Sequence, residues 1–363
     1  MIKLNLSDLH TKILRAHSFL PDVAGSSTAL PPLIVQIDVT HRCDLRCSMC
    51  FQLKNADIGR EMTCGQIKKI IDQLPLWSVV TFSGGEPFVR NDFREILRYA
   101  LARRKCNILT NAGLVTAQDI DLFVSGGLLV IGISLDGLGE THDRIRGRKG
   151  LFEKVVGVIE NLRAARQRKK TAYPLIDIKT VALRENVREL YKLFKSVQSW
   201  GADYFSLSLP KLFSMQFNEP YFDDISRIRD RAPDRPEAFS GDDTKALLEQ
   251  VGLISKDNAS GKILRQYPYD IFEPEGLLKY YGGRLTVRDF RQCRVPWSLI
   301  CISPYGDVYP CMSYRTGSAV KDSIAEIWNG ERYRLFRKNI RERGLFPGCV
   351  GCCYAVFKGG QGV

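Results

Sequence analysis

The sequence has no long apolar run and no secretory signal. No window of its 363 residues approaches the roughly 18 uninterrupted apolar residues that a membrane span needs. Residues 1–5 lack the charged-then-apolar pattern that opens a signal peptide. With 44% hydrophobic residues the chain can form a large core, so we expect a globular protein in the cytoplasm with no membrane span.

Acidic residues are scarce relative to basic ones, 40 against 53, which gives a net charge of +13. Such an excess can indicate a nucleic-acid partner. Much of it falls in residues 166–170 and 332–343, whose pattern is typical of solvated helix faces and helix C-termini. We therefore do not favour nucleic acid, and an anionic cofactor or phosphorylated metabolite would use some of the charge.

The sequence also lacks the evenly spread, paired cysteines of a disulfide framework. Its 11 cysteines are odd in number. They gather in two groups about 240 residues apart, a distribution that favours metal binding over disulfides. Cys64 and Cys106 stand outside both groups, and we expect buried thiols at these positions because free cysteine is commonly buried.

The first group forms a C-x3-C-x2-C motif from Cys43, Cys47 and Cys50, at the end of an apolar run. This spacing lets three thiolates converge on one face of an iron–sulfur cube and leaves the fourth iron open for a substrate or cofactor. Zinc is the alternative metal. Structural zinc usually takes cysteines in C-x2-C pairs, and here Cys64 or His41 would have to complete its site.

From Leu33 onward, apolar runs alternate with helix-period segments, which is typical of βα units around a parallel sheet. We predict strands at 33–39, 78–82, 106–110, 128–135, 175–183 and 203–209, and helices at 64–74, 91–104, 116–125, 151–167 and 187–200. The predicted fold class is α/β, a partial (β/α)6 barrel of the TIM type. Such a barrel gathers its chemistry at the C-terminal ends of its strands.

Unusual residues do follow these strands. The second ends in Ser83-Gly84-Gly85-Glu86-Pro87, where paired glycines let backbone groups approach a ligand closely. The third is followed by Asn111, and the fourth ends at Ser134 and Asp136, whose short polar side chains suit sugar hydroxyls or an amino-acid ligand. Taken singly, these residues are also typical of helix caps and turns.

The cysteine motif followed by a GGEP segment resembles the radical S-adenosylmethionine (SAM) superfamily. The resemblance implies a [4Fe–4S] cluster on the three cysteines, whose open iron chelates SAM. It also implies reductive cleavage of SAM to a 5′-deoxyadenosyl radical that abstracts a hydrogen from the substrate. The family often has an aromatic residue before the last cysteine. Met49 stands there instead, and we expect the neighbouring Phe51 to contact the adenine.

The same resemblance implies SAM contacts along the strand ends. The predicted contacts are Phe51, Ser83, Gly84, Gly85, Glu86, Asn111, Ser134, Asp136, Arg146 and Asn186. A bidentate contact from Arg146 to the methionyl carboxylate is one that a lysine could not reproduce. The alternative for Arg146 is a surface ion pair.

The second cysteine group lies near the C-terminus. Residues 301–311 predict a β-hairpin with its turn at 304–307, and residues 323–343 predict a helical stretch. This part resembles the twitch or SPASM-like extension of radical SAM enzymes, which has a cysteine, a glycine, a second cysteine after four residues and a later C-x2-C pair. The cysteine spacing is similar to that of 2-deoxy-scyllo-inosamine dehydrogenase, which has one auxiliary [4Fe–4S] cluster.

We therefore predict one auxiliary [4Fe–4S] cluster, with a four-cysteine zinc ribbon as the alternative. The expected ligands are Cys293, Cys311, Cys349 and Cys352. Cys353 could replace Cys352, and Cys301 fits a buried strand residue.

These segments divide the chain into an N-terminal extension (1–32, with a helix at 6–19), a partial barrel (33–210), a helical connector that shapes the substrate pocket (211–290) and an auxiliary-cluster domain (291–363). The resemblance implies a radical SAM oxidoreductase. Its expected substrate is a small polar metabolite of natural-product or cofactor biosynthesis, dehydrogenated with flavodoxin or ferredoxin as the reducing partner.

Three alternatives to this function stay open. The first is a radical epimerase or bond-forming enzyme. The second is a maturase of a peptide or protein side chain, which we expect less because the region before Leu33 is too short for the usual leader-peptide domain. The third is a zinc-stabilised nucleic-acid-binding protein without enzyme activity.

Overall fold

The computed structural model describes residues 25–50, 59–210, 224–226, 239–261, 263–311 and 314–359. The predicted helix at 6–19 and much of the first part of the connector lie outside these residues. Within them, no helix has both the length and the apolar character that crossing a membrane requires.

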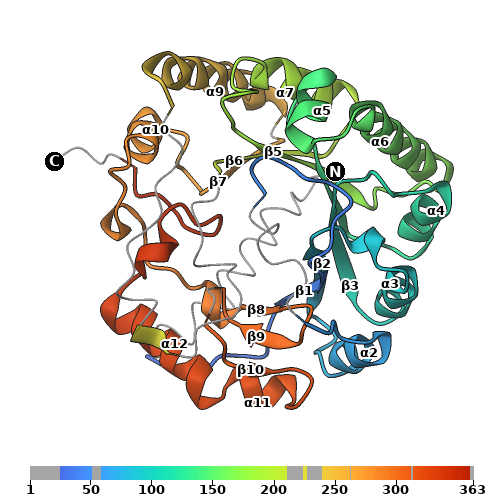
Figure 1. Cartoon of the computed structure of the whole chain (residues 1–363), viewed down its shortest axis with the longest axis vertical. Helices are drawn as coiled ribbons and strands as arrows, with labels where there is room; N and C mark the ends of the chain where they lie inside the picture. Colours follow the sequence, from blue (N-terminus) through green and yellow to red (C-terminus); the bar gives the residue numbers. More distant parts are fainter. Residues whose placement is uncertain are drawn as a thin grey trace.

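A single sheet organises the described residues (Figure 1). Its strand order is β10-β9-β8-β1-β2-β3-β4-β5-β6-β7, and the neighbours from β8 to β7 run parallel. The strands are β1 (Ile34–Thr40), β2 (Val79–Gly84), β3 (Lys105–Thr110), β4 (Val130–Ser134), β5 (Leu175–Val181), β6 (Tyr204–Ser208), β7 (Leu264–Tyr267), β8 (Leu299–Ile302), β9 (Asp307–Tyr309) and β10 (Gly317–Ser318).

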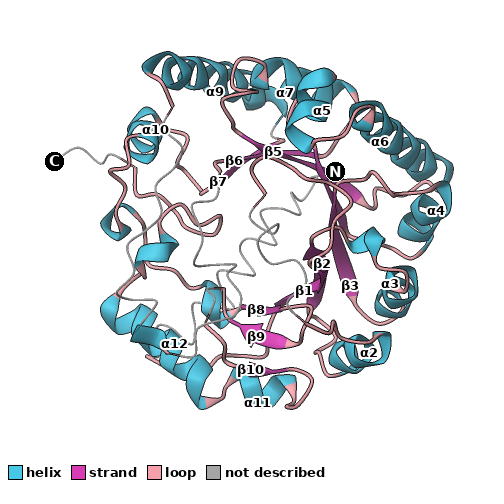
Figure 2. Cartoon of the chain, in the orientation of Figure 1, coloured by secondary structure: helices cyan, strands magenta, loops and turns pink. Residues whose placement is uncertain are grey.

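Helices surround this sheet on its outer side, as Figure 2 shows. They are α2 (Cys64–Asp72), α3 (Phe93–Leu101), α4 (Ala117–Ser125), α5 (Glu140–Arg146), α6 (Leu151–Arg168), α7 (Leu190–Ser199), α9 (Gly241–Gly261), α10 (Pro274–Tyr281), α11 (Ile324–Trp328) and α12 (Glu331–Arg343). Capping boxes at Thr63, Thr116 and Ser323 explain where three of them begin, because each side chain accepts a hydrogen bond from the third helical N–H.

The partial-barrel fold is confirmed, and each of the six predicted strands is present. The connector differs from the prediction. It contains the long helix α9 and a further strand, β7, which pairs in parallel with β6 and extends the barrel wall. The sequence of β7, Leu-Arg-Gln-Tyr, has no apolar run that would reveal a strand.

The predicted hairpin is also confirmed, since β8 and β9 are antiparallel on either side of residues 303–306. Strand β8 pairs in parallel with β1, so the C-terminal domain continues the sheet of the barrel. Gly306 has a φ of +84°, and a Cβ there would lie 2.5 Å from a methyl carbon of Val320. A side chain at this turn would therefore be strained and crowded.

The two faces of the sheet differ in chemistry, because successive side chains of a strand point to opposite sides. On β5 and β6, Ile176, Ile178 and Phe205 are fully buried, and Phe205 packs edge-on against Phe194 of α7. That side is the outer face. Residues between them in sequence, such as Asp177, belong to the opposite side, which we call the inner face.

Candidate active site

The three cysteines of the first motif lie on residues 41–50, which we call the cysteine loop. Backbone hydrogen bonds tie this loop to the turn after β2: the N–H of Gly85 donates to the carbonyl of Thr40 at 2.8 Å, and the N–H of Glu86 donates to that of Arg42 at 2.9 Å. The N–H of Ser48 donates to the carbonyl of Ile145 at 3.1 Å. The loop is therefore held between β2 and α5.

The paired glycines of the GGEP turn make this approach possible. A Cβ on Gly84 would lie 2.2 Å from the carbonyl oxygen of Thr40, and one on Gly85 would lie 2.2 Å from that of Arg42. Gly84 also has a φ of +122°. The glycines are thus required for packing against the end of β1 and the cysteine loop, a reason that sequence reasoning missed; their contact with SAM stays a prediction.

Glu86 joins this turn to the end of β3. Its fully buried carboxylate accepts hydrogen bonds from the Thr110 hydroxyl at 2.8 Å, the Asn111 N–H at 2.7 Å and the Phe88 N–H at 3.2 Å. Burial raises the pKa of Glu86 to about 7, although these hydrogen bonds oppose the shift. The Glu86 side chain therefore joins the turn after β2 to the end of β3. A contact of Glu86 with SAM stays a prediction.

Polar groups point at the sulfurs of the cysteine loop. The Asn111 amide nitrogen lies 3.8 Å from the Cys43 sulfur, and a guanidinium nitrogen of Arg146 lies 3.7 Å from the Cys47 sulfur. Burial raises the pKa of Cys43 to about 12 and also raises that of Cys47, where Arg146 partly offsets it. Donors aimed at these sulfurs suit thiolates that are held by a metal.

Arg146 connects this sulfur to Asp136 after β4. Its Nε donates to a carboxylate oxygen of the fully buried Asp136 at 2.6 Å, and the other oxygen accepts from the Val181 N–H at 2.8 Å. Asn186 donates to the carbonyls of Asp136 and Val181 at 2.6 and 2.8 Å. Asp136, Arg146 and Asn186 therefore lie close together. The Asn186 amide is already hydrogen-bonded to the ends of β4 and β5.

His142 also positions Asp136. Its Nδ1 accepts a hydrogen bond from the Asp136 N–H at 3.1 Å, and burial lowers the pKa of the imidazole to about 3. The neutral ring therefore acts as an acceptor beside the Arg146–Asp136 pair. The sequence offered no signal that would separate this histidine from a surface residue of α5.

Ser83 and Ser134 lie on the inner face near the strand ends. The Ser83 hydroxyl donates to Asp38 on β1 at 2.5 Å, and Asp38 also lies 3.5 Å from the hydroxyl of Tyr309 in the C-terminal hairpin. Asp38 is 2% exposed. Sequence reasoning missed it, although a charge between Ile37 and Val39 in an apolar strand was a usable signal. Phe51 lies outside the described residues.

Replacing Arg146 with Gln should weaken SAM binding about tenfold, since one charge-assisted hydrogen bond contributes on that order. Equilibrium dialysis with labelled SAM measures the change. Arg146→Lys should not restore the affinity, because an ammonium cannot reproduce the planar fork. Arg144→Gln, on the exposed side of the same helix, is the matched control. Equal affinity in the Arg146 and Arg144 variants would show that Arg146 is only structural.

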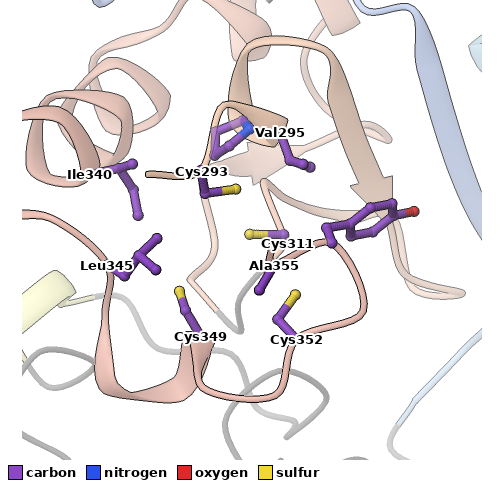
Figure 3. Close-up of a pocket in the computed structure, with 10 residues that line it drawn as sticks. Cys293, Val295, Cys311, Ile340, Leu345, Cys349, Cys352 and Ala355 are labelled. Carbon is purple, nitrogen blue, oxygen red and sulfur yellow. The ribbon is translucent and has the colours of Figure 1, made fainter. Parts of the chain in front are cut away.

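The second cysteine group forms another site. Cys293, Cys311, Cys349 and Cys352 line one cavity, and Figure 3 shows their sulfurs turned toward a common space. Apolar side chains, among them Ile340, complete the lining. Burial raises the pKa of Cys293 to about 11 and raises that of Cys311 well above its ordinary value. The structure therefore brings the four expected ligands together, and their binding of a cluster stays a prediction.

Four thiols around one cavity can hold either an iron–sulfur cluster or a single zinc ion. Zinc would lie about 2.3 Å from each thiolate, whereas a four-iron cluster would take one thiolate on each iron. The donor set therefore fits both of the metals that the sequence suggested.

The remaining cysteines occupy other places. Cys353 is not part of the cavity lining, but it lies beside it: a hydrogen bond between the Cys353 and Cys352 side chains, together with burial, raises the pKa of Cys352. Cys301 packs with Leu299 and Tyr309. As predicted, Cys106 is buried, whereas Cys64 is only half-buried at the start of α2.

A parallel barrel that carries one thiol site on the loop after its first strand and another in an appended domain is the architecture of an iron–sulfur enzyme. Comparison with known families agrees with this class. Residues 37–195 match the model of the radical SAM superfamily, and residues 293–353 match the SPASM iron–sulfur cluster-binding domain. The chain belongs to the radical SAM superfamily and has a C-terminal SPASM domain. These domains imply SAM, a [4Fe–4S] cluster that binds it and auxiliary iron–sulfur binding.

Relatives match across both domains. The AdoMet-dependent heme synthase of Methanosarcina barkeri is 31% identical over 335 residues, covering 89% of this chain and 88% of that protein. The PqqA peptide cyclase of Bradyrhizobium diazoefficiens is 26% identical over 321 residues, covering 84% and 75%. Streptococcus suis SuiB, solved with its precursor peptide SuiA, superposes with a TM-score of 0.62 at 16% identity over 89% of this chain and 70% of that chain; this likeness concerns the fold.

Proposed function

We propose that this radical SAM enzyme is a maturase that modifies a side chain of a peptide or protein. The observation that carries the proposal is the match to a PqqA peptide cyclase, which extends over 84% of the chain and includes both domains. The relatives therefore favour a peptide substrate over the dehydrogenation of a small polar metabolite that the sequence led us to expect.

The residues around the two sites have separate tasks in this proposal. When bound, SAM and its cluster supply the radical chemistry. Cys43, Cys47 and Cys50 hold that cluster, while Asn111 and Arg146 direct N–H groups at two of the sulfurs. The apolar outer face and the helices packed against it form the barrel wall, and the substrate would lie against the inner face.

The SPASM cavity gives the enzyme a second redox site. Four buried thiols on an apolar lining would hold a cluster away from solvent. Such a cluster can accept an electron from the substrate, which makes the reaction a net oxidation, with flavodoxin or ferredoxin as the reducing partner. With a net oxidation of its substrate, the enzyme would be a radical SAM oxidoreductase.

A tetrapyrrole is the second candidate substrate. It is favoured by one specific observation, the 31% identity to an AdoMet-dependent heme synthase over 88% of that protein's length. Fe-coproporphyrin III is a suitable probe, because a different relative, 35% identical over 132 residues, is named for that compound.

Anaerobic turnover distinguishes the two substrates. Reduced enzyme with SAM is incubated with peptides encoded beside its gene or with Fe-coproporphyrin III, and 5′-deoxyadenosine and product masses are recorded. The proposal predicts that a peptide loses two hydrogen atoms and that the product accumulates with 5′-deoxyadenosine. A mass change in the porphyrin, with the peptides unchanged, would replace the peptide function with the tetrapyrrole one.

A further inference from the structure

Charged residues gather on the inner face of β5 and β7, where neither the cysteine loop nor the SPASM cavity uses them. Register places them on one side of the sheet: Lys179 pairs with Ser206, and Ser206 pairs with Arg265. Partners in a parallel register share a face. Asp177, two residues before Lys179, belongs to the same face.

These residues form a compact ionic group. The Asp177 carboxylate, whose side chain is 2% exposed, accepts from the Ser206 hydroxyl at 2.6 Å and lies 2.7 Å from the Lys179 ammonium. A guanidinium nitrogen of Arg265 lies 3.4 Å from the same carboxylate. Two cations therefore share one buried anion, which leaves one positive charge uncompensated within the group.

The cations are accessible although the anion is not. The side chains of Lys179 and Arg265 are 35% and 28% exposed. Each also lies over an aromatic ring: the ammonium is 5.4 Å from the centre of Tyr267, and the guanidinium is 3.3 Å from that of Tyr204. Cation–π contacts of this kind hold a cation in place without neutralising it. We call Lys179, Asp177 and Arg265 the cationic platform.

The platform lies next to the predicted SAM contacts. Lys179 pairs with Ser134, and its carbonyl accepts from the Leu135 N–H at 2.9 Å, one residue before Asp136. Gly132 on β4 leaves room for the lysine stem, because a Cβ there would lie 3.2 Å from the Lys179 Cε. A ligand held by the platform would therefore lie beside the strand ends where the chemistry is expected.

We propose that the cationic platform binds a carboxylate of the substrate and so orients it on the inner face of the barrel. A guanidinium and an ammonium side by side suit a carboxylate, and their buried counter-ion fixes them in advance, which lowers the entropy cost of binding. This inference rests on the proposed function and narrows it: the modified peptide would carry an acidic side chain near its reacting residue.

The test uses anaerobically reconstituted protein with SAM and a simple probe, benzene-1,3,5-tricarboxylate, with its triamide as the uncharged isostere. Calorimetry should show binding of the tricarboxylate but not of the triamide. Arg265→Gln and Lys179→Gln should each weaken the binding about tenfold, the loss expected for a hydrogen bond to a charged group.

Lys195→Gln is the matched control, since it removes one positive charge from the outer helix α7, where Lys195 pairs with Asp257. This variant should bind the probe as the parent does. Equal weakening in the Lys195 and Arg265 variants would mean that only the net charge matters, and it would overturn the proposal. Absence of probe binding, or equal binding of the triamide, would overturn it as well.

Competition then identifies the source of the carboxylate. A peptide with one Glu should displace the tricarboxylate better than its Gln counterpart, which supports an acidic peptide. Displacement by Fe-coproporphyrin III alone would retain the platform and reject the peptide function. Product formation from a peptide by the Arg265→Gln enzyme at the parent's rate and KM would retain the function and reject the platform.

Discussion

Replacing Cys43, Cys47 and Cys50 together with Ala should abolish SAM cleavage and leave iron at the second site. The three thiols are the ligands that the cysteine loop offers, and Asn111 and Arg146 donate to two of them. Without the thiolates the cluster has no anchor. Iron should fall from about eight to about four per chain, as expected for the loss of one of two four-iron clusters, and 5′-deoxyadenosine should disappear.

Cys64→Ala is the control for this experiment, because Cys64 is a half-buried thiol at the start of α2 that lies outside both groups. It should retain the iron and the SAM cleavage of the parent. Cleavage that survives in the triple variant would mean that the cluster is held elsewhere.

The double replacement of Cys349 and Cys352 with Ala should remove the auxiliary iron but spare SAM cleavage. Both thiols line the cavity shared with Cys293 and Cys311, and two ligands cannot hold a cluster that needs four. Iron should fall to about four per chain, one cluster of the two. Product formation should be lost while 5′-deoxyadenosine still forms, because the site that accepts the substrate electron is missing.

Cys353→Ala separates the two adjacent thiols. Cys352 lines the cavity and Cys353 does not, so the Cys353 variant should keep the full iron content. If this variant lost the auxiliary iron while Cys352→Ala kept it, Cys353 and not Cys352 would be the cluster ligand.

Features that depend on neighbouring residues in the chain could be predicted from the sequence. The cysteine motif, the GGEP turn and the apolar strands are contiguous, so their spacing carried the fold class and the expected metal ligands. Strand β7 was missed because two of its four residues are Arg265 and Gln266, which no hydrophobic pattern identifies as strand. Its position became visible only through pairing with β6.

The inner face could not be predicted for a related reason. Whether Asp177, Lys179 and Arg265 meet depends on the register across β5, β6 and β7. Lys179 and Arg265 are 86 positions apart in the sequence. The role of Gly84 and Gly85 was likewise hidden, since the backbone that they approach belongs to the end of β1 and the start of the cysteine loop. Substrate choice left no readable signal in the sequence, and the peptide substrate is a proposal that rests on the relatives.

The most direct test of the central claim is electron paramagnetic resonance of oxygen-free, reduced protein before and after SAM is added. If the thiols of the cysteine loop hold a cluster with an open iron, brown protein should give a [4Fe–4S]+ signal that changes when SAM binds. Colourless protein that contains zinc and gives no signal, with or without SAM, would contradict the account.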